Sequence, residues 1–315
     1  MKKESCMKKI TLGFIVLWAS MGMAAVFKHH LPEGWYPRDP GALQNVLASL
    51  DQGGTRNDAK ESATAALIVP HAGYQFSGAV AAAGYRLLDK NRIQTVIILA
   101  PSHRVAFKGV ALPFFSAYQT PLGTLTVAAA CVQKLAQSSL FEVRPDVWGQ
   151  EHSLEVQLPF IQQYLGNEVA IVPLIVGSVS PGELSSIARS LRGCIDEHTL
   201  VVISSDFIHH GKRFGYAPFE HTADVQKSIA ALDKNIIDTI IQKKEADVRA
   251  LLNTTRATVC GAAPIRLFKR LQEMGAWPDG LRGRVVTYDT SYTVTKDPVN
   301  SVSYAAIVFT KKDAA

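Results

Sequence analysis

A recurring pattern, in which an apolar run ends near a residue able to bind a metal or carry a proton, constrains the fold of this chain most strongly. The three runs and the residues that follow them are 65–69 with His71, 95–100 with His103, and 200–204 with Asp206 and His209. Continuous apolar runs of this length are typical of parallel strands buried on both faces. Because open α/β sheets keep their sites beyond the carboxyl ends of such strands, we expect one pocket, with His71 near its centre.

Segments with helical patterning alternate with these runs along the rest of the chain. Small residues fill a helix expected over 77–88, and further strands are expected at 169–176, 284–291 and 303–309. This alternation predicts an α/β fold, a mostly parallel central sheet flanked by helices. A hydrophobic content of 47% with 19% charged residues is typical of a folded chain, and no repeat or linker divides it. We therefore expect a single domain over residues 63–312.

Two regions precede that domain. Lys8 and Lys9 stand before an apolar run over 10–25, so residues 1–25 are predicted to be a cleaved export signal. The alternative is a retained membrane anchor, although the run is somewhat short for a span. Residues 26–62 are predicted to be an N-terminal extension with one short helix over 42–50. The protein is thus expected to be exported, most simply to the periplasm, and to touch a membrane only if the segment is uncleaved.

The charge and the cysteines exclude some classes of function. The formal net charge is +6, but no Arg/Lys cluster with interleaved aromatic residues is present, so no nucleic-acid partner is expected. Removal of Cys6 with the signal would leave three cysteines in an oxidising compartment. At most one disulfide can then form, and we expect it to be Cys131–Cys194, with Cys260 free.

The residues that could carry chemistry are few. His71, His103, Asp206, His209 and Cys260 form the first group, and Glu151, His152 and Glu155 stand behind them. Strand-end loops can supply N, S and O donors to a transition metal, although the local spacing matches no dense metal motif. The alternative is that these histidines are hydrogen-bonded structural residues.

Other chemistries have less support in the sequence. No G-x-S-x-G elbow and no glycine-rich phosphate loop is present, which argues against a serine hydrolase and a nucleotide cofactor. A thiol nucleophile set of Cys260, His209 and Asp206 stays possible. The adjacent His29 and His30 are expected to be an exposed pair. A helix expected to open at Glu151 would bring His152 and Glu155 close together.

Several short motifs occur in one order along the chain. They are Pro70-His-Ala-Gly-Tyr74, Pro101-Ser-His103, Glu151-His-Ser-Leu-Glu155, Ser204-Ser-Asp-Phe207, Cys260-Gly261 and Ser301-Val-Ser-Tyr-Ala-Ala306. At these motifs the sequence resembles the Memo family, whose bacterial and archaeal branch is called AmmeMemoRadiSam system protein B. The resemblance runs from about residue 30 to 310.

The resemblance implies a fold like that of the class III, LigB-type extradiol dioxygenases. It also implies a metal site formed by His71, His103 and Cys260, holding iron or copper, with zinc possible. Asp206 and His209 would line the same pocket as acid/base groups. In the pocket's outer layer we expect Tyr74, His152 and Glu155.

Three functions follow from the resemblance as hypotheses. The first is metal binding or a metal-dependent redox role, the second is a non-haem iron extradiol-type dioxygenase, and the third is a module that binds a peptide or protein partner. Whether the protein is an enzyme stays open. Ala262, Ala263 and Ile208 replace polar or soft side chains of the animal proteins. The pocket therefore has fewer soft donors than theirs.

Overall fold

The computed structural model describes residues 25–51, 64–220 and 224–312. The predicted export signal, apart from Ala25, and Cys6 within it lie outside these ranges. The strands are β1 (Val26–Lys28), β2 (Thr64–Val69), β3 (Thr95–Pro101), β4 (Val110–Leu112), β5 (Ala117–Thr120), β6 (Gly123–Thr126), β7 (Phe141–Val143), β8 (Ala170–Val176), β9 (Thr199–Ser204), β10 (His209–His210), β11 (Leu281–Thr290) and β12 (Ser301–Lys311).

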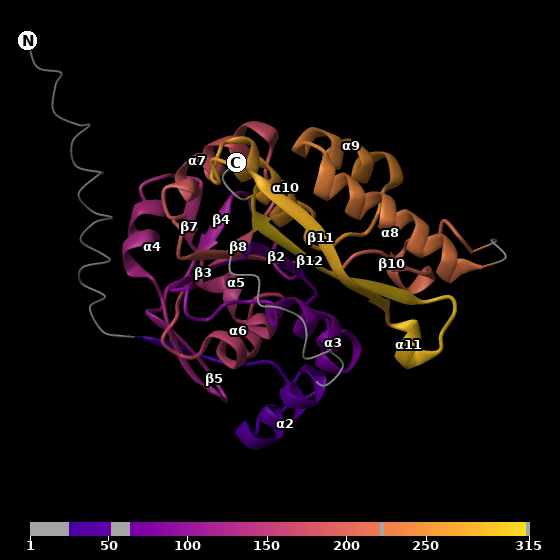
Figure 1. Ribbon diagram of the computed structural model, residues 1–315, viewed down its shortest axis with the longest axis horizontal. Helices are drawn as coiled ribbons and strands as arrows, with labels where there is room; N and C mark the ends of the chain where they lie inside the picture. Colours follow the sequence, from indigo (N-terminus) through magenta and orange to yellow (C-terminus); the bar gives the residue numbers. More distant parts are fainter. Residues whose placement is uncertain (1–24, 52–63, 221–223, 313–315) are drawn as a thin grey trace, which may run out of the picture.

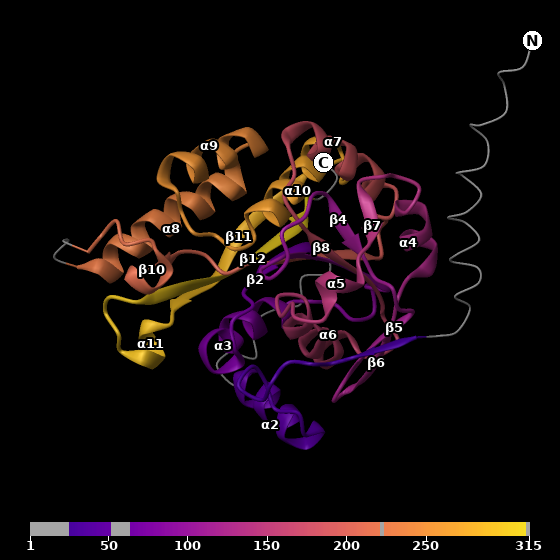
Figure 2. The same ribbon diagram turned by 180° about the vertical axis from the view of Figure 1, so that it is seen from behind.

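The helices cover both faces of a large central sheet (Figures 1 and 2). The α-helices are α2 (Pro40–Asp51), α3 (Tyr74–Tyr85), α4 (Ala129–Leu135), α5 (Pro145–Trp148), α6 (Leu158–Leu165), α7 (Pro181–Arg192), α8 (Val225–Gln242), α9 (Glu245–Thr255), α10 (Ala262–Glu273) and α11 (Tyr292–Thr295). Two 3-10 turns are η1 (Glu155–Gln157) and η2 (Lys212–Phe214). Helix α3 packs on β2, β11 and β12, whereas α10 packs on β3 and β9. The predicted α/β class and its flanking helices are confirmed.

Within the described residues, nine strands form the central sheet. Their order is β10-β12-β2-β9-β3-β8-β4-β7, with β11 paired to β12. The four strands β2, β9, β3 and β8 are parallel, but β12 and β4 join them antiparallel on either side. The continuous run of parallel pairing therefore lies at the centre of the sheet, where the strands are buried on both faces, and β4 and β7 form a further parallel pair at one edge.

The register of the central strands aligns their carboxyl ends at one edge. Val69 of β2 pairs with Ser204 of β9, and Pro101 of β3 pairs with Val176 of β8. The loops that begin with Pro70, Ser102 and Ser205 therefore leave the sheet side by side.

The N-terminal residues pack against the same core rather than apart from it. Strand β1 pairs with β5 in a second, three-stranded sheet β1-β5-β6. The buried side chains of this region join the main hydrophobic core, and they are Leu31, Tyr36, Leu43 and Leu47. The short helix predicted over 42–50 is present as part of α2 (Pro40–Asp51).

One helix begins later than the sequence pattern predicts. Residues 151–154 form a turn, η1 follows, and the regular helix α6 begins only at Leu158. Pro159 has no backbone N–H and is accepted in the first turn of a helix but not in its interior. The prediction that a helix opens at Glu151 is therefore wrong, and His152 and Glu155 face different surroundings.

The predicted cysteine pairing is confirmed. Cys131 of α4 is bonded to Cys194, just after α7, and Cys260 is a free thiol. None of the helices in the described ranges combines the length and the apolar character needed to cross a membrane.

Candidate metal centre

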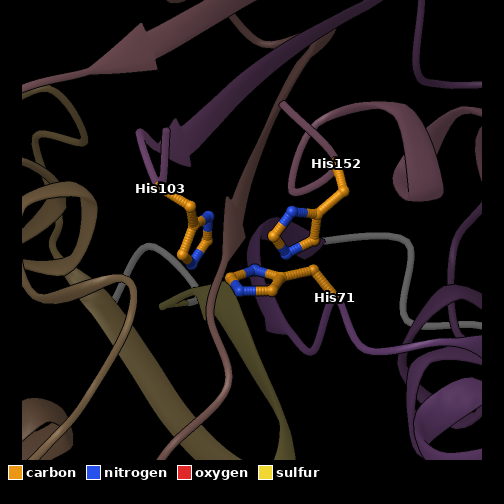
Figure 3. Close-up of side chains that lie close together, drawn as sticks. All are labelled: His71, His103 and His152. Atoms are coloured by element: carbon orange, nitrogen blue, oxygen red, sulfur yellow. The ribbon is translucent and has the colours of Figure 1, made fainter. Parts of the chain in front are cut away.

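Three histidines from three loops meet at the aligned strand ends. His71 follows β2, His103 follows β3 and His152 lies in the turn before η1. One ring nitrogen from each lies within 4.8 Å of those of the other two, and Figure 3 shows the three rings gathered around one space. Their ring centroids are 4.4 to 5.4 Å apart. We call these three residues the histidine cluster.

His71 is the most buried member, with 1% of its surface exposed. Its Nδ1 lies 2.9 Å from the Ser204 hydroxyl, and its backbone N–H donates to Asp206 Oδ1 at 2.8 Å. Its Nε2 has no hydrogen-bond partner among the described residues. Burial, together with the charge of His103, lowers the pKa of His71 well below its usual value. The imidazole is therefore neutral at pH 7, which is the form that binds metal.

Glu151 lies beside the other two histidines and hydrogen-bonds His103. Its Oε1 lies 2.9 Å from His103 Nδ1 and 3.4 Å from His152 Nδ1, and its Oε2 accepts the His103 backbone N–H. Burial alone would raise the pKa of Glu151, but the hydrogen bonds and charge of His103 lower it to about 2. A carboxylate only accepts, so His103 Nδ1 carries a hydrogen, and in the neutral ring the lone pair is then on Nε2. A carboxylate behind a histidine in this way is the usual support of a metal ligand.

Burial also keeps His152 neutral. Desolvation, with the repulsion that a protonated ring would meet from His71 and His103, lowers the pKa of His152 to about 3. The ring of Trp35 covers it at a centroid distance of 4.3 Å. His152 is thus fixed between the N-terminal segment and the other two histidines.

Asp206, His209 and Cys260 lie beside the histidine cluster. Asp206 Oδ2 is 4.0 Å from His71 Nε2, and burial raises the pKa of Asp206. Cys260 Sγ lies 3.7 Å from His209 Nε2 and is not one of the three close donors. The position of Cys260 depends on the next residue, Gly261, whose N–H donates to the Ser205 hydroxyl. A Cβ atom at position 261 would clash with Ser205 Cβ, so the close approach of the two backbones requires glycine.

The Cys260 thiol is not poised as a nucleophile in this arrangement. Burial, followed by the negative charges of Asp206 and Glu151, raises its pKa far above the ordinary value. The thiolate is the reactive form, so these surroundings do not activate the thiol set of Cys260, His209 and Asp206. A bound metal ion would reverse that effect on the thiol.

Tyr74 and Glu155, predicted for the outer layer of the pocket, take other positions. Tyr74 is buried and donates to the Val156 carbonyl at 2.7 Å. Glu155 is buried and accepts from His30, Leu31, Tyr36 and Tyr118. His30 is therefore half-buried and paired 2.7 Å from Glu155, so the expectation of an exposed His29–His30 pair is wrong.

The histidine cluster suits a transition metal ion. Imidazole nitrogens are donors that zinc, copper and iron accept, and the unpartnered Nε2 of His71 is a buried lone pair that needs a partner. Two nitrogens bound to one ion at about 2.1 Å lie no more than about 4.2 Å apart, so small ring rotations would close the site. The ligand and acid/base roles assigned to individual residues stay predictions.

The sequence does not predict that His152 belongs to the histidine cluster, and it does not predict the contacts that Trp35 and Ser204 make with the cluster. The Glu151-His152 pair can be seen in the sequence, but a helix that begins at Glu151 would place both residues behind the site. Trp35 lies 117 positions away from His152 in the sequence, and no periodic pattern links them. The sequence places Ser204 at a strand end and in the Ser204-Ser-Asp-Phe207 motif, but it does not predict the contact with the His71 ring.

Comparison with known proteins places the chain among the Memo-like proteins. The family model described as "Memo-like protein" matches residues 32–308. A MEMO1 family protein of Schizosaccharomyces pombe is 33% identical over 298 residues, covering 86% of this chain and 94% of that protein. The memo-1 homolog of Caenorhabditis elegans is also 33% identical, covering 86% and 79%.

More distant similarity is found as well. Protein MEMO1 of Xenopus laevis is 30% identical, covering 86% of this chain and 93% of that protein. Among solved structures, an uncharacterized protein of Escherichia coli K12 gives a TM-score of 0.49 at 16% identity, covering 78% of this chain and 99% of the other.

Proposed function

Because the chain belongs to the Memo-like protein family, we propose that it binds a transition metal ion, iron or copper, at the histidine cluster. The ligands are His71, His103 and a third donor. Geometry favours His152 over Cys260 as that donor, since its nitrogen already lies within 4.8 Å of the other two. This convergence of three imidazole nitrogens, one of them buried without a partner, is the observation that carries the proposal.

The donor set bears on the choice of metal. Imidazole nitrogen binds copper, zinc and iron, and the affinity of such a site rises from iron to copper. A thiol beside three imidazoles adds a soft donor that favours copper. We therefore expect Cu²⁺ to bind more tightly than Zn²⁺ and Fe²⁺ when the three are offered in turn.

Metal content measured on purified protein tests the proposal. Wild-type protein, reconstituted with one metal at a time and desalted, is expected to retain about one equivalent. His71→Ala, His103→Ala and His152→Ala are each expected to lose most of it, whereas Cys260→Ser separates the two candidates for the third donor. His198→Ala is the matched control, because His198 lies outside the cluster and bonds the Arg92 carbonyl. Equal metal content in wild type and all three cluster variants would refute the proposal.

A dioxygenase of the extradiol type is the second candidate function. Such enzymes use two histidines and one carboxylate around iron. Asp206 supports this possibility, because its Oδ2 is 4.0 Å from His71 Nε2, and His209 would then serve as the acid/base group. Oxygen uptake by the Fe²⁺-loaded protein with a panel of catechols tests it, with Asp206→Asn as the variant that should abolish uptake. If the protein retains metal but consumes no oxygen with any catechol, the dioxygenase hypothesis is refuted, and metal binding or another redox role is the function that stays.

Export to an oxidising compartment is the last part of the proposal. The Cys131–Cys194 disulfide supports it, because disulfides rarely persist in the cytosol. Cell fractionation with the N-terminal mass of the mature chain distinguishes a cleaved signal from an anchor. A peptide or protein partner would be sought by crosslinking in the same fraction.

A further inference from the structure

Ser204 stands at the centre of a buried hydrogen-bond network behind His71. Its Oγ lies 2.6 Å from the Ser153 carbonyl, 2.9 Å from Gln157 Nε2 and 2.9 Å from His71 Nδ1. Ser204, Ser153 and Gln157 are fully buried and His71 is 1% exposed, so water does not compete for these contacts.

The direction of two of these hydrogen bonds is fixed by chemistry. A carbonyl only accepts, so the Ser153 carbonyl takes the single hydrogen of the Ser204 hydroxyl. The amide of Gln157 is oriented by two further neighbours. Its Nε2 donates to the Pro70 carbonyl at 2.9 Å, and its Oε1 accepts from the Tyr85 hydroxyl at 3.0 Å. Gln157 therefore also donates to Ser204.

Ser204 has no hydrogen left for His71. Its Oγ can only accept from the imidazole, so His71 Nδ1 must carry a hydrogen. The opposite tautomer would set the bare Nδ1 lone pair against a lone pair of Ser204. Its Nε2–H would face Asp206 Oδ2 at 4.0 Å, which is too far for a hydrogen bond to offset that loss.

We infer that Ser204, oriented by Gln157 and the Ser153 carbonyl, is a positioning residue that fixes the Nδ1–H tautomer of His71 and leaves its Nε2 lone pair directed at the histidine cluster. The use of that lone pair for metal rests on the proposed function, but the tautomer does not. A buried histidine without such a partner would divide between two tautomers, and only one of them offers Nε2. Losing a supporting contact of this kind lowers metal affinity by about 10- to 100-fold.

Nitrogen-15 NMR of metal-free protein labelled at histidine tests the tautomer directly. Wild-type His71 is expected to show a protonated Nδ1 and a bare Nε2. In Ser204→Ala the Nε2–H form should appear. Ser205→Ala is the matched control for the tautomer alone, because the Ser205 hydroxyl bonds Gly261 N and the Asp206 carbonyl and, among the described residues, forms no hydrogen bond with the His71 ring. His103, held by Glu151, should keep its Nδ1–H form throughout and reports that each variant is folded.

The outcomes separate this inference from the proposed function. An Nε2–H form of His71 in the wild type would overturn the inference without any variant, as would an unchanged tautomer in Ser204→Ala. A shifted tautomer together with a 10- to 100-fold weaker affinity for Cu²⁺ or Zn²⁺ supports both. A shifted tautomer with unchanged affinity refutes the positioning role. If the wild type binds no metal but shows the expected tautomers, the tautomer assignment stands and the proposed function falls.

Discussion

Replacement of Glu155 by glutamine should loosen the N-terminal segment from the rest of the protein. The carboxylate is fully buried, and its two oxygens accept from two backbone N–H groups and two tyrosine hydroxyls. His30 Nδ1 lies a further 2.7 Å from Oε2. All but Tyr118 of these donors belong to residues 30–36, so this one side chain joins the N-terminal segment to the turn that carries His152.

The cost follows from the donors. Glutamine has one oxygen, so its NH₂ group must face either the His30 or the Leu31 backbone N–H, and neither can reverse its polarity. One buried N–H left without an acceptor costs about 1–3 kcal/mol, and the hydrogen bonds that remain lose roughly 1 kcal/mol each with the negative charge. Glu155→Gln should therefore lower the free energy of unfolding by about 3–5 kcal/mol, a large share of the typical total of about 5–15 kcal/mol.

Urea unfolding followed by tryptophan fluorescence measures this change. Glu168→Gln, at an exposed glutamate, is the control and should change the free energy by less than about 0.5 kcal/mol. Hydrogen exchange should rise first in residues 29–36, because they lose their acceptor. A loss below about 1 kcal/mol in Glu155→Gln would refute this account of the carboxylate.

The same carboxylate predicts a dependence on pH. Burial alone would raise the pKa of Glu155, but the contacts with His30, Tyr36 and Tyr118 lower it below its ordinary value of 4.5. A folded-state pKa below the unfolded one gives stability that is present above the unfolded pKa and is lost as the pH falls through the folded pKa. Wild type should therefore lose stability in acid more steeply than Glu155→Gln does.

Three further outcomes are expected. Replacing both Cys131 and Cys194 by serine should lower the free energy of unfolding by about 4 kcal/mol in calorimetry, because the disulfide closes a loop of 63 residues; a loss under about 1 kcal/mol would contradict this. Burial raises the pKa of Asp233 from 3.8 to about 6, so the folded protein binds this proton more tightly than the unfolded chain does. The free energy of unfolding should therefore fall by ~2–3 kcal/mol as the pH rises from 4 to 6. Urea titrations at the two pH values should show this decline in the wild type and not in Asp233→Asn. Glu151→Gln should weaken metal binding by about 10- to 100-fold in competition with a chelator, with Glu142→Gln as the exposed control.

The strand-end part of the site could be predicted from the sequence because one physical rule governs it. Parallel strands in register end at one edge, so apolar runs that precede His71, His103 and Asp206 were sufficient to bring these residues together. The rule does not extend to His152. Its position depends on where a helix begins, and that depends on Pro159 and on the side chain of Glu151 taking up nearby N–H groups.

The contacts of Glu155 and Trp35 could not be predicted for a different reason. The contacts of Glu155 with residues 30–36 and of Trp35 with His152 each span more than a hundred positions in the sequence, and neither belongs to a repeating pattern. A buried carboxylate needs hydrogen-bond donors, and most donors to Glu155 come from residues 30–36, which reach it only when the N-terminal segment has folded onto the domain. The same holds for Ser204, whose role depends on a glutamine from a neighbouring turn.

The histidine cluster therefore combines two kinds of support. His71 and His103 follow strands of one rigid sheet, and each has an acceptor behind its Nδ1. His152 lies in a turn instead, and the ring of Trp35 from the N-terminal segment packs against it. A metal ion bound by the two strand-end histidines would thus meet a third donor that is held by packing against the N-terminal segment and not by the sheet. The three nitrogens lie within 4.8 Å of one another, and because the third donor is supported differently from the other two, the third ligand, His152 or Cys260, is the one that experiment must identify.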